Sequence, residues 1–537
     1  MHSSYRVPCT ILFFLFSIAY LIIISNVITI AVVNGAWYRQ LATRQYATTI
    51  MNYSARAPIN DRSGKALALN VQHFSACVEP RSVQDPQSLI AFLESHFPEA
   101  AVRFKSHNQD AFMYIKRHLT DEQVTLIENC SSCDITLLPE QGRWYPLSCA
   151  SLVLGTTDSD NNGIEGIEVA FNQALRGTPS IYLLEREART SRYFTKVIKS
   201  FGTPGIPVSL TLDSTLQFLV SQELENTCVE FNAQLVNAIV INPINGEILA
   251  MAQHAHPESG IATVRNTTLC DAYEMGSVIK VCTALAALAE GVVTFDELID
   301  CKNKKTAIID GRTINTTIAG GVLPFWQVIA QSNNIGTAQV AKRLDTKLYD
   351  HLVRMGFGHK TGIELPGEAT GFINPPDNWS KHSIISLSYG YEINNTLMQL
   401  ARFFCTIATN GLLITPHILY EPTRSDSYVR VYEQEPVRQV NAILEKTTLE
   451  GTARRAAIKG YTVRCKTGTA NLLEHGIYNP DKNLFTCAGI IQKDDYCRVI
   501  VVMVKEIGPK NKFASQVAAP LFERIAQKTL IKDAVIQ

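Results

Sequence analysis

The sequence lacks an excess of charge of either sign, because its 537 residues include 49 Lys and Arg against 49 Asp and Glu. A balanced chain exerts no overall attraction on phosphate backbones, which argues against nucleic acid as a partner. Charged residues make up only 18% of the chain and hydrophobic residues 46%, so most of it is expected to be globular. Internal repeats and low-complexity tracts are also lacking, and the length predicts about two to four domains.

Cysteines and histidines at metal-binding spacing are lacking as well. Among 13 cysteines the only close pair is Cys130-Ser-Ser-Cys133, with no second pair and no histidines at the spacing of a zinc site. In an oxidising compartment this pair could form a small disulfide loop, and we interpret most other cysteines as small buried hydrophobic residues. We therefore expect no metal and no cofactor.

One long uncharged run, from Ile11 to Val33, lies near the N-terminus. A helix of that length, at about 1.5 Å per residue, crosses a bilayer with some tilt. The alternative is a cleaved signal peptide, but its apolar region is usually about 7 to 15 residues long, and Asn34-Gly35-Ala36 is a poor small-x-small cleavage site. We therefore predict an uncleaved membrane anchor. Charges flank the run on both sides and leave its orientation open.

Strand-like runs lie at both ends of the region after Val208, with helical stretches between them. The runs are Leu235 to Ile241, Glu247 to Ala252, Tyr461 to Thr469, Phe485 to Gln492 and Cys497 to Lys505. This arrangement predicts an α+β fold, with an antiparallel sheet flanked by a helical subdomain. Phe201 to Pro207 is rich in glycine and proline and is the predicted domain boundary.

Ser277 and Lys280 open an apolar helical stretch that runs to about Leu288. At a spacing of three residues both side chains lie on one face, a turn apart. The rest of the helix is apolar nearly all round, which is typical of a buried helix. Burial lowers the pKa of a lysine, so Lys280 could accept a proton from the Ser277 hydroxyl. Ser-x-x-Lys also arises by chance, with the lysine reaching water, so it needs support.

Two further motifs follow along the chain. Ser332-Asn333-Asn334 lies between apolar helical runs, and Lys466-Thr467-Gly468-Thr469 ends a strand-like run. Lys466 offers a positive charge suited to a substrate carboxylate, and the two threonines alternate onto one strand face. The glycine lets a ligand backbone approach closely. Taken singly, Ser332 and Asn334 would be assigned to a cap or a turn, but the order of the three motifs favours catalysis.

The order Ser-x-x-Lys, Ser-x-Asn, Lys-Thr-Gly resembles that of penicillin-binding proteins and related β-lactamases. The chain is similar to class B penicillin-binding proteins, especially their FtsI-like, division-specific branch. The resemblance covers nearly the whole chain and is carried by Arg56 to Ala68, Gly163 to Gly177, Leu210 to Gln217, Tyr273-Glu274, Phe357 to Glu368, Ser388 to Ala401 and Gly451 to Ala453.

This resemblance implies a domain order. A short cytoplasmic tail (1–10) and a transmembrane anchor (11–33) would precede an elongated, mixed pedestal or dimerisation-like domain (37–200). Residues 208–537 would form a serine β-lactamase-like transpeptidase domain, with a five-stranded antiparallel sheet flanked by helices and a helical subdomain.

The resemblance also implies a serine D,D-transpeptidase that cross-links peptidoglycan stem peptides ending in D-Ala-D-Ala and is inhibited by β-lactams. Ser277 would be the nucleophile and Lys280 the base, while Ser332 would relay a proton to the leaving amine. Asn334 would hold the substrate amide and Lys280. Lys466 would belong with these catalytic residues, and Thr467, Gly468 and Thr469 would bind the substrate. By the same resemblance, the amides of Ser277 and Thr469 would form the oxyanion hole.

Three positions depart from the family pattern: Met275 replaces a usual proline, and Cys465 and Glu392 replace usual glycines. None of these removes a catalytic group. Cys465 is expected to point away from Lys466 into the core, because neighbouring strand residues face opposite ways. Glu392 leaves the shape of the loop near the cleft open.

Several functions remain as alternatives. The elongation-specific class B branch would perform the same chemistry at another cellular site. A β-lactamase would not need the anchor and pedestal, and the base required for efficient deacylation is not evident. A non-catalytic penicillin-binding scaffold or sensor is disfavoured because all three motifs are intact.

The resemblance finally implies a location and partners. The anchor would be a single pass in the bacterial inner membrane, with the catalytic domain in the periplasm. No glycosyltransferase domain is expected before the pedestal, so glycan polymerisation would come from a SEDS-family glycosyltransferase acting with other division proteins.

Overall fold

The computed structural model describes residues 6–106, 110, 112–130, 134–186, 193–260, 265–422, 428–474, 476–507 and 513–534. The chain divides into two compact units. The first unit comprises Met1–Arg56 and Arg176–Ile206, and the second comprises Ala57–Leu175 and Pro207–Gln537.

The first unit begins with the long apolar helix α1 (Arg6–Ile28), which continues into a π-helical turn at Thr29–Val33. Residues Val7–Val33 form a helix long and apolar enough to cross a membrane, and none of it is buried against the rest of the protein. Helix α2 (Gly35–Tyr46) follows. A three-stranded antiparallel sheet completes the unit, in the order β1 (Ala47–Asn52), β6 (Ser180–Arg186), β7 (Tyr193–Ser200).

The second unit starts with a sheet built around the long strand β3 (Ala66–Val78). This strand pairs with β2 (Ile59–Asn60), β4 (Met113–Lys116) and β5 (Thr136–Trp144), and β2 also pairs in parallel with β8 (Val208–Ser209). The helices of this region are α3 (Pro86–His96), α4 (Pro98–Ser106), α5 (Asp121–Glu128), α6 (Ser151–Leu154), α7 (Gly166–Ala170) and α8 (Asn172–Arg176). Helices α3 to α5 share a small hydrophobic core of their own, which includes Leu93 and Phe104.

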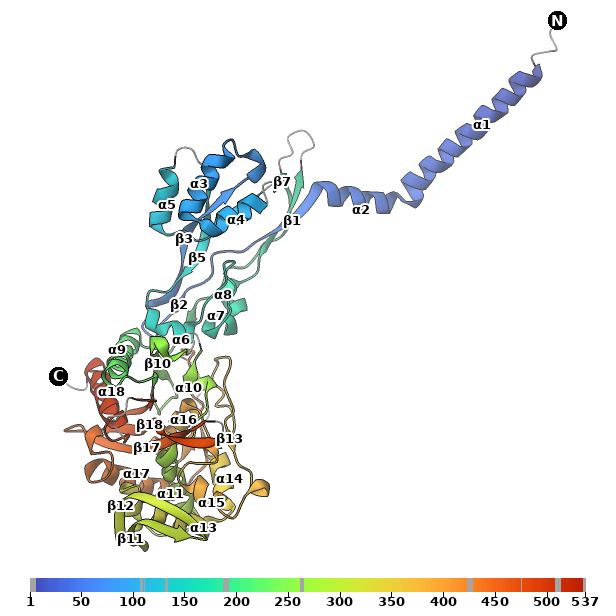
Figure 1. Ribbon diagram of the computed structural model, residues 1–537. Coiled ribbons are helices and arrows are strands. Elements are labelled where there is room, and N and C mark those ends of the chain that lie inside the picture. Colours follow the sequence, from blue (N-terminus) through green and yellow to red (C-terminus); the bar gives the residue numbers. More distant parts are fainter. Residues whose placement is uncertain are drawn as a thin grey trace. The chain divides into compact units, whose positions relative to one another are not determined.

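The rest of the second unit contains the predicted five-stranded antiparallel sheet (Figure 1). Its order is β10 (Ile248–Ala255), β9 (Leu235–Ile241), β19 (Tyr496–Lys505), β18 (Ile477–Lys493) and β17 (Thr462–Glu474). All neighbouring strands are antiparallel. The α+β prediction and the five strand-like runs are therefore confirmed, although β17 and β18 extend beyond the predicted bounds.

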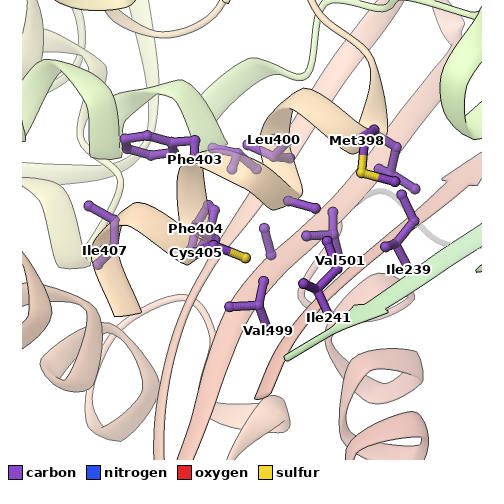
Figure 2. Close-up of a cluster of buried hydrophobic side chains, with 14 of the residues drawn as sticks. Ile239, Ile241, Met398, Leu400, Phe403, Phe404, Cys405, Ile407, Val499 and Val501 are labelled. Carbon is purple, nitrogen blue, oxygen red and sulfur yellow. The ribbon is translucent and has the colours of Figure 1, made fainter. Parts of the chain in front are cut away.

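Both faces of this sheet are buried, because apolar side chains alternate between two cores along each central strand. Ile239 and Val501 belong to the core on one face, and Val240 and Val502 to the core on the other. Helix α16 (Leu397–Ala408) packs on the first face, and Figure 2 shows its side chains gathered with those of β9 and β19. Helices α9 (Ser214–Phe231) and α18 (Ala518–Lys532) cover the second.

The helical subdomain lies between β10 and β17 in the sequence. Its helices are α10 (Thr267–Cys270), α11 (Lys280–Ala289), α12 (Phe325–Ala330), α13 (Asn334–Leu344), α14 (Lys347–Arg354), α15 (Ser383–Ser388), α16 and α17 (Gln434–Leu449). Two short strand pairs join β13 (Phe372–Ile373) to β14 (Ile393–Asn394) and β15 (Leu412–Leu413) to β16 (Val429–Arg430).

The sequence analysis missed a long hairpin in this subdomain, where it expected only helices. Strands β11 (Leu298–Ile309) and β12 (Arg312–Pro324) pair antiparallel across Asp310-Gly311. Both turn residues have positive φ, 54° and 84°. Asp-Gly in that conformation is a strong hairpin signal, and it was present in the sequence.

Most cysteines behave as expected, since the free cysteines of the described residues are mainly buried. Cys465 is fully buried in the core beneath the sheet, as predicted. Cys130 is disulfide-bonded. Cys133, its neighbour in the predicted close pair, lies outside the described residues.

Candidate active site

The turn that carries Ser277 is held against the edge strand β17. It is one turn of 3₁₀-helix, Gly276–Ile279, that leads directly into α11. Gly276 has φ of 59°, and a Cβ there would stand 2.6 Å from the carbonyl oxygen of Thr469. A Cβ on Gly468 would stand 2.4 Å from the carbonyl oxygen of Met275. Two glycines therefore allow the serine turn and the Lys-Thr-Gly strand to approach backbone to backbone.

Lys280 is completely buried one helical turn after Ser277. Its Nζ donates to the carbonyl oxygen of Ser332 at 2.7 Å and lies 3.0 Å from the Ser332 hydroxyl oxygen. No carboxylate is bonded to it among the described residues. Burial, reinforced by the nearby charge of Lys466, holds the pKa of Lys280 well below the usual lysine value. The lowered pKa makes the neutral, proton-accepting form of this amine easier to reach.

Ser332 lies in the short link between α12 and α13 with φ of 59°, a left-handed conformation that is uncommon for serine. The next residue, Asn333, caps α13 by accepting a hydrogen bond from the Gly336 N–H at 3.0 Å. The cap is thus made by the middle residue of the motif. Ser332 and Asn334, on either side of it, are left to line the cleft.

Asn334 has one bonded and one unbonded side-chain atom. Its Nδ2 donates to the carbonyl oxygen of Asn315 at 2.7 Å, which fixes the orientation of the amide. Its Oδ1 is buried and has no hydrogen-bond partner among the described residues. A buried acceptor without a partner is costly, and here it is available to a ligand N–H group.

Lys466 and Thr467 are neighbours on β17, but Lys466 is sealed inside the protein and Thr467 lines the cleft. Lys466 has no exposed surface, and its Nζ donates to the carbonyl oxygen of Thr467 at 2.9 Å. Burial lowers the pKa of Lys466 to about 8. Thr467 donates from its hydroxyl to the Thr452 hydroxyl at 3.0 Å. The Thr469 hydroxyl accepts from the Ala514 N–H at 3.1 Å.

One cleft of about 490 Å³ joins these motifs. Ser277, Ser332, Asn334, Thr467 and Thr469 all line it, while Lys280 and Lys466 lie beneath them. The sequence analysis did not assign the remaining lining residues to the site, and these are Thr317, Ile318, Gln331, Gly451, Thr452, Arg454, Arg455, Phe513, Ala514 and Ser515. They come from β12, the ends of α12 and α17, and the segment before α18, and no local motif links them.

The described residues contain no group of three or more His, Cys, Asp or Glu side chains that could hold a metal ion. The cleft offers a serine hydroxyl one helical turn from a buried amine whose pKa is lowered.

Two family comparisons match this architecture. Residues 236–527 match the penicillin binding protein transpeptidase domain, which covers more than half of the chain. The chain belongs to the penicillin-binding protein family. Residues 51–210 of this penicillin-binding protein match the penicillin-binding protein dimerisation domain.

Curated relatives extend over most of the chain. The peptidoglycan D,D-transpeptidase FtsI of Escherichia coli K12 is 28% identical over 511 residues, which cover 91% of this chain and 84% of that protein. The stage V sporulation protein D of Bacillus subtilis is also 28% identical and covers 96% of this chain and 84% of its own length.

Solved structures share the fold. The apo form of penicillin-binding protein 3 from Mycobacterium tuberculosis has a TM-score of 0.68 at 25% identity and covers 90% of this chain and 98% of its own. The transpeptidase domain of Burkholderia pseudomallei penicillin-binding protein 3 has a TM-score of 0.56 at 29% identity, covering 61% and 96%.

Glu392, which replaces a usual glycine of the family, keeps a glycine-like backbone in this penicillin-binding protein. Its φ is 59°, and its N–H donates to Glu274 Oε1 at 2.8 Å. The same oxygen accepts from the Tyr478 hydroxyl at 3.1 Å. Glu274 therefore ties the serine turn to the loop at 392 and to the tip of the β17–β18 hairpin. Burial raises the pKa of Glu274, and these two hydrogen bonds partly oppose that shift.

Proposed function

We propose that this penicillin-binding protein is a serine D,D-transpeptidase that cross-links peptidoglycan stem peptides through an acyl-enzyme on Ser277, and that β-lactams acylate the same residue. The observation that carries the proposal is the buried Lys280, bonded to Ser332 and one turn from Ser277. Burial lowers the pKa of such an amine and so favours its neutral form, which can take the proton from the serine hydroxyl.

In the acylation step Ser277 Oγ attacks the carbonyl carbon of the penultimate D-Ala, and its proton passes to the Lys280 amine. The amides of Ser277 and Thr469 stabilise the oxyanion, a contribution of about 3 kcal/mol for each such donor. The carbon–nitrogen bond then breaks, and the leaving D-Ala amine takes its proton through Ser332. Asn334 Oδ1 accepts a hydrogen bond from the peptide N–H of the substrate.

In the second step an amine of a neighbouring stem attacks the ester carbonyl. The new amide bond forms, the ester bond breaks, and the Ser277 hydroxyl regains a proton. Gly468 acts indirectly, since its missing side chain lets the serine turn pack against β17. The donor peptide then lies in the cleft that Thr467 and Thr469 line. Lys466 supports the site from beneath these threonines.

The domain organisation that goes with this function is the one expected from the sequence. Residues 11–33 form an uncleaved anchor in the inner membrane behind the cytoplasmic tail 1–10. Residues 37–200 form the pedestal and residues 208–537 the periplasmic catalytic domain. The apolar helix Val7–Val33 and the family matches at 51–210 and 236–527 support this division. The disulfide at Cys130 supports an oxidising compartment.

We place the enzyme in septal wall synthesis. FtsI-named relatives that match more than 80% of this chain support the division role over elongation. In that role a SEDS-family glycosyltransferase supplies the glycan strands, and other division proteins bring the two enzymes together.

Labelling with a fluorescent penicillin tests the nucleophile. The wild-type protein is expected to acquire one covalent label, and Ser277→Ala is expected to acquire none while keeping its unfolding midpoint. Ser515→Ala is the matched control, because Ser515 lines the same cleft without belonging to a motif. Equal labelling of wild type and Ser277→Ala would refute the assignment.

A further inference from the structure

The wall of the cleft formed by the segment after α17 carries positive charge. Arg454 and Arg455 line the cleft and are exposed. All the other lining residues within the described part of the chain have hydroxyl, amide or apolar side chains, or none. Two cations without a facing carboxylate make this cleft suited to an anionic ligand.

Lys466, the residue expected from the sequence to meet a substrate carboxylate, does not present its charge to the cleft. Its side chain has no exposed surface and its Nζ is engaged by the Thr467 carbonyl oxygen. Burial lowers its pKa to about 8, so that a fraction of the molecules carry a neutral amine here in mildly alkaline solution. A carboxylate in the cleft needs a more accessible partner.

The arginine segment is fixed between the two motifs that frame the cleft. The Thr452 N–H donates to the carbonyl oxygen of Ala330, just before the Ser332 motif, at 3.2 Å. The Thr452 hydroxyl accepts from Thr467 on β17. A Cβ on Gly451 would stand 2.4 Å from the Ala330 carbonyl oxygen, so the approach requires glycine. The backbone that carries the arginines is therefore positioned by the site itself.

The two guanidinium groups differ in how they are held. One Nη of Arg454 donates to the carbonyl oxygen of Glu450 at 2.7 Å, which fixes that side chain along its own segment. Arg455 has no hydrogen bond or ion pair to any residue that the structure describes. A guanidinium group binds a carboxylate with two parallel N–H donors, which a buried ammonium cannot do.

We propose that Arg454 and Arg455 form the carboxylate receptor of this cleft and make it select acyl-donor peptides with a free carboxylate next to the scissile bond. This assignment rests on the proposed function, because the donor is the peptide that acylates Ser277. The Thr452 hydroxyl lines the same cleft. Because it accepts from Thr467, it keeps its own proton to donate to the same carboxylate. Lys466 then contributes positive charge from beneath the cleft-lining threonines of β17 and does not bind the substrate directly.

A pair of matched thioester donors tests the receptor. One is an N-acyl-D-alanyl thioester whose leaving group ends in a carboxylate, and the other ends in a neutral carboxamide. Thiol release gives kcat/KM for both donors with the full-length protein, with Arg454→Ala, Arg455→Ala and the double variant, and with Arg455→Lys. Arg438→Ala is the matched control, because Arg438 is an exposed arginine on α17 that pairs with Glu435.

The double variant is expected to lose about tenfold or more in kcat/KM for the carboxylate donor. Its kcat/KM for the carboxamide donor should change less than about twofold, and Arg455→Lys should recover part of the preference. Arg438→Ala should resemble wild type. If the double alanine variant unfolds, the double glutamine variant, which keeps the three-carbon stem and a polar end without the charge, replaces it.

If the double variant kept the wild-type preference for the carboxylate donor, the receptor assignment would be wrong. An equal loss of kcat/KM with both donors would also overturn it, because that result indicates a structural role. Failure of the proposed function looks different. In that case the wild type releases no more thiol from either donor than Ser277→Ala does.

Discussion

Lys280 and Lys466 both lie inside the protein with no exposed surface, and neither is bonded to a carboxylate in the described part of the chain. Each keeps hydrogen bonds to backbone carbonyl oxygens, which a neutral amine can also make. The charge of Lys466 also raises the cost of a charge on Lys280. In the proposed mechanism Lys280 is the base, and the burial that lowers its pKa works against stability at neutral pH.

Replacing Lys280 with methionine should separate these two effects. Lys280→Met is expected to lower the rate of penicillin acylation about 100-fold or more, because the base is gone. Its free energy of unfolding at pH 7 should be equal to that of the wild type or higher by up to about 2 kcal/mol. Stopped-flow acylation and urea unfolding measure the two quantities.

The pH dependence gives an independent check on the same variant. The folded-state pKa of Lys280 is lowered, so between that value and the usual lysine pKa the unfolded wild type binds more protons than the folded state. Wild-type stability relative to Lys280→Met should therefore rise with pH across this range. Lys528→Met, at an exposed lysine of α18, should leave both readouts unchanged. If Lys280→Met were acylated by penicillin at the wild-type rate at neutral pH, Lys280 would not be the base.

At the scale of elements, the site depends on where helices begin. Helix α13 begins within the Ser-x-Asn motif, and α11 begins at Lys280, one turn into the Ser-x-x-Lys motif. Asn333 supplies the cap of α13 and is itself buried. Because its neighbours on both sides line the cleft, the cap also sets their directions.

Asn333→Ala is expected to lower the free energy of unfolding by about 1 kcal/mol, since the Gly336 N–H loses its acceptor. It should also slow penicillin acylation about tenfold, because Ser332 and Asn334 lose their alignment. Asn333→Ser keeps a capping oxygen and should recover most of both. Urea unfolding and acylation rates measure the effects. If Asn333→Ala were less stable but acylated at the wild-type rate, the cap would have no part in aligning the motif.

At the scale of the whole molecule, the chain combines an apolar helix, which has no packing partner among the described residues, with a catalytic unit whose sheet is buried on both faces. Apolar surface of that extent on a single helix is accounted for by a lipid environment. In the proposed function the apolar helix sets the location of the enzyme, and the second unit performs the chemistry.

Depletion of the protein in its host should block septation and leave elongation intact, so that cells grow as filaments. A version that begins at Gly35 should still be labelled by fluorescent penicillin in extracts but should not restore septation, because it lacks the anchor. Microscopy and gel fluorescence give the two readouts. Rounded or bulging cells after depletion would instead assign the enzyme to elongation.

The parts of this protein that could be predicted from sequence are those set by short-range geometry. The short apolar runs at β9 and β19 predicted strands, and the spacing of Ser277 and Lys280 predicted one helix face. The hairpin β11–β12 carried a readable Asp310-Gly311 signal that was overlooked. Arg454 and Arg455 carried none, since a pair of arginines after a helix is usually a solvated surface.

The sequence by itself determined the three motifs, the long apolar run near the N-terminus and the strand-like runs of the sheet, because each depends on residues within a few positions of one another. Only the tertiary structure decided that Lys280 meets Ser332, that Lys466 is sealed beneath Thr467, and that the arginine segment is bound between Ala330 and β17. In all but the Lys466 case, these contacts join distant parts of the chain. All of them exist because the packing of α11, α12 and β17 leaves room for specific side chains, which no local pattern records.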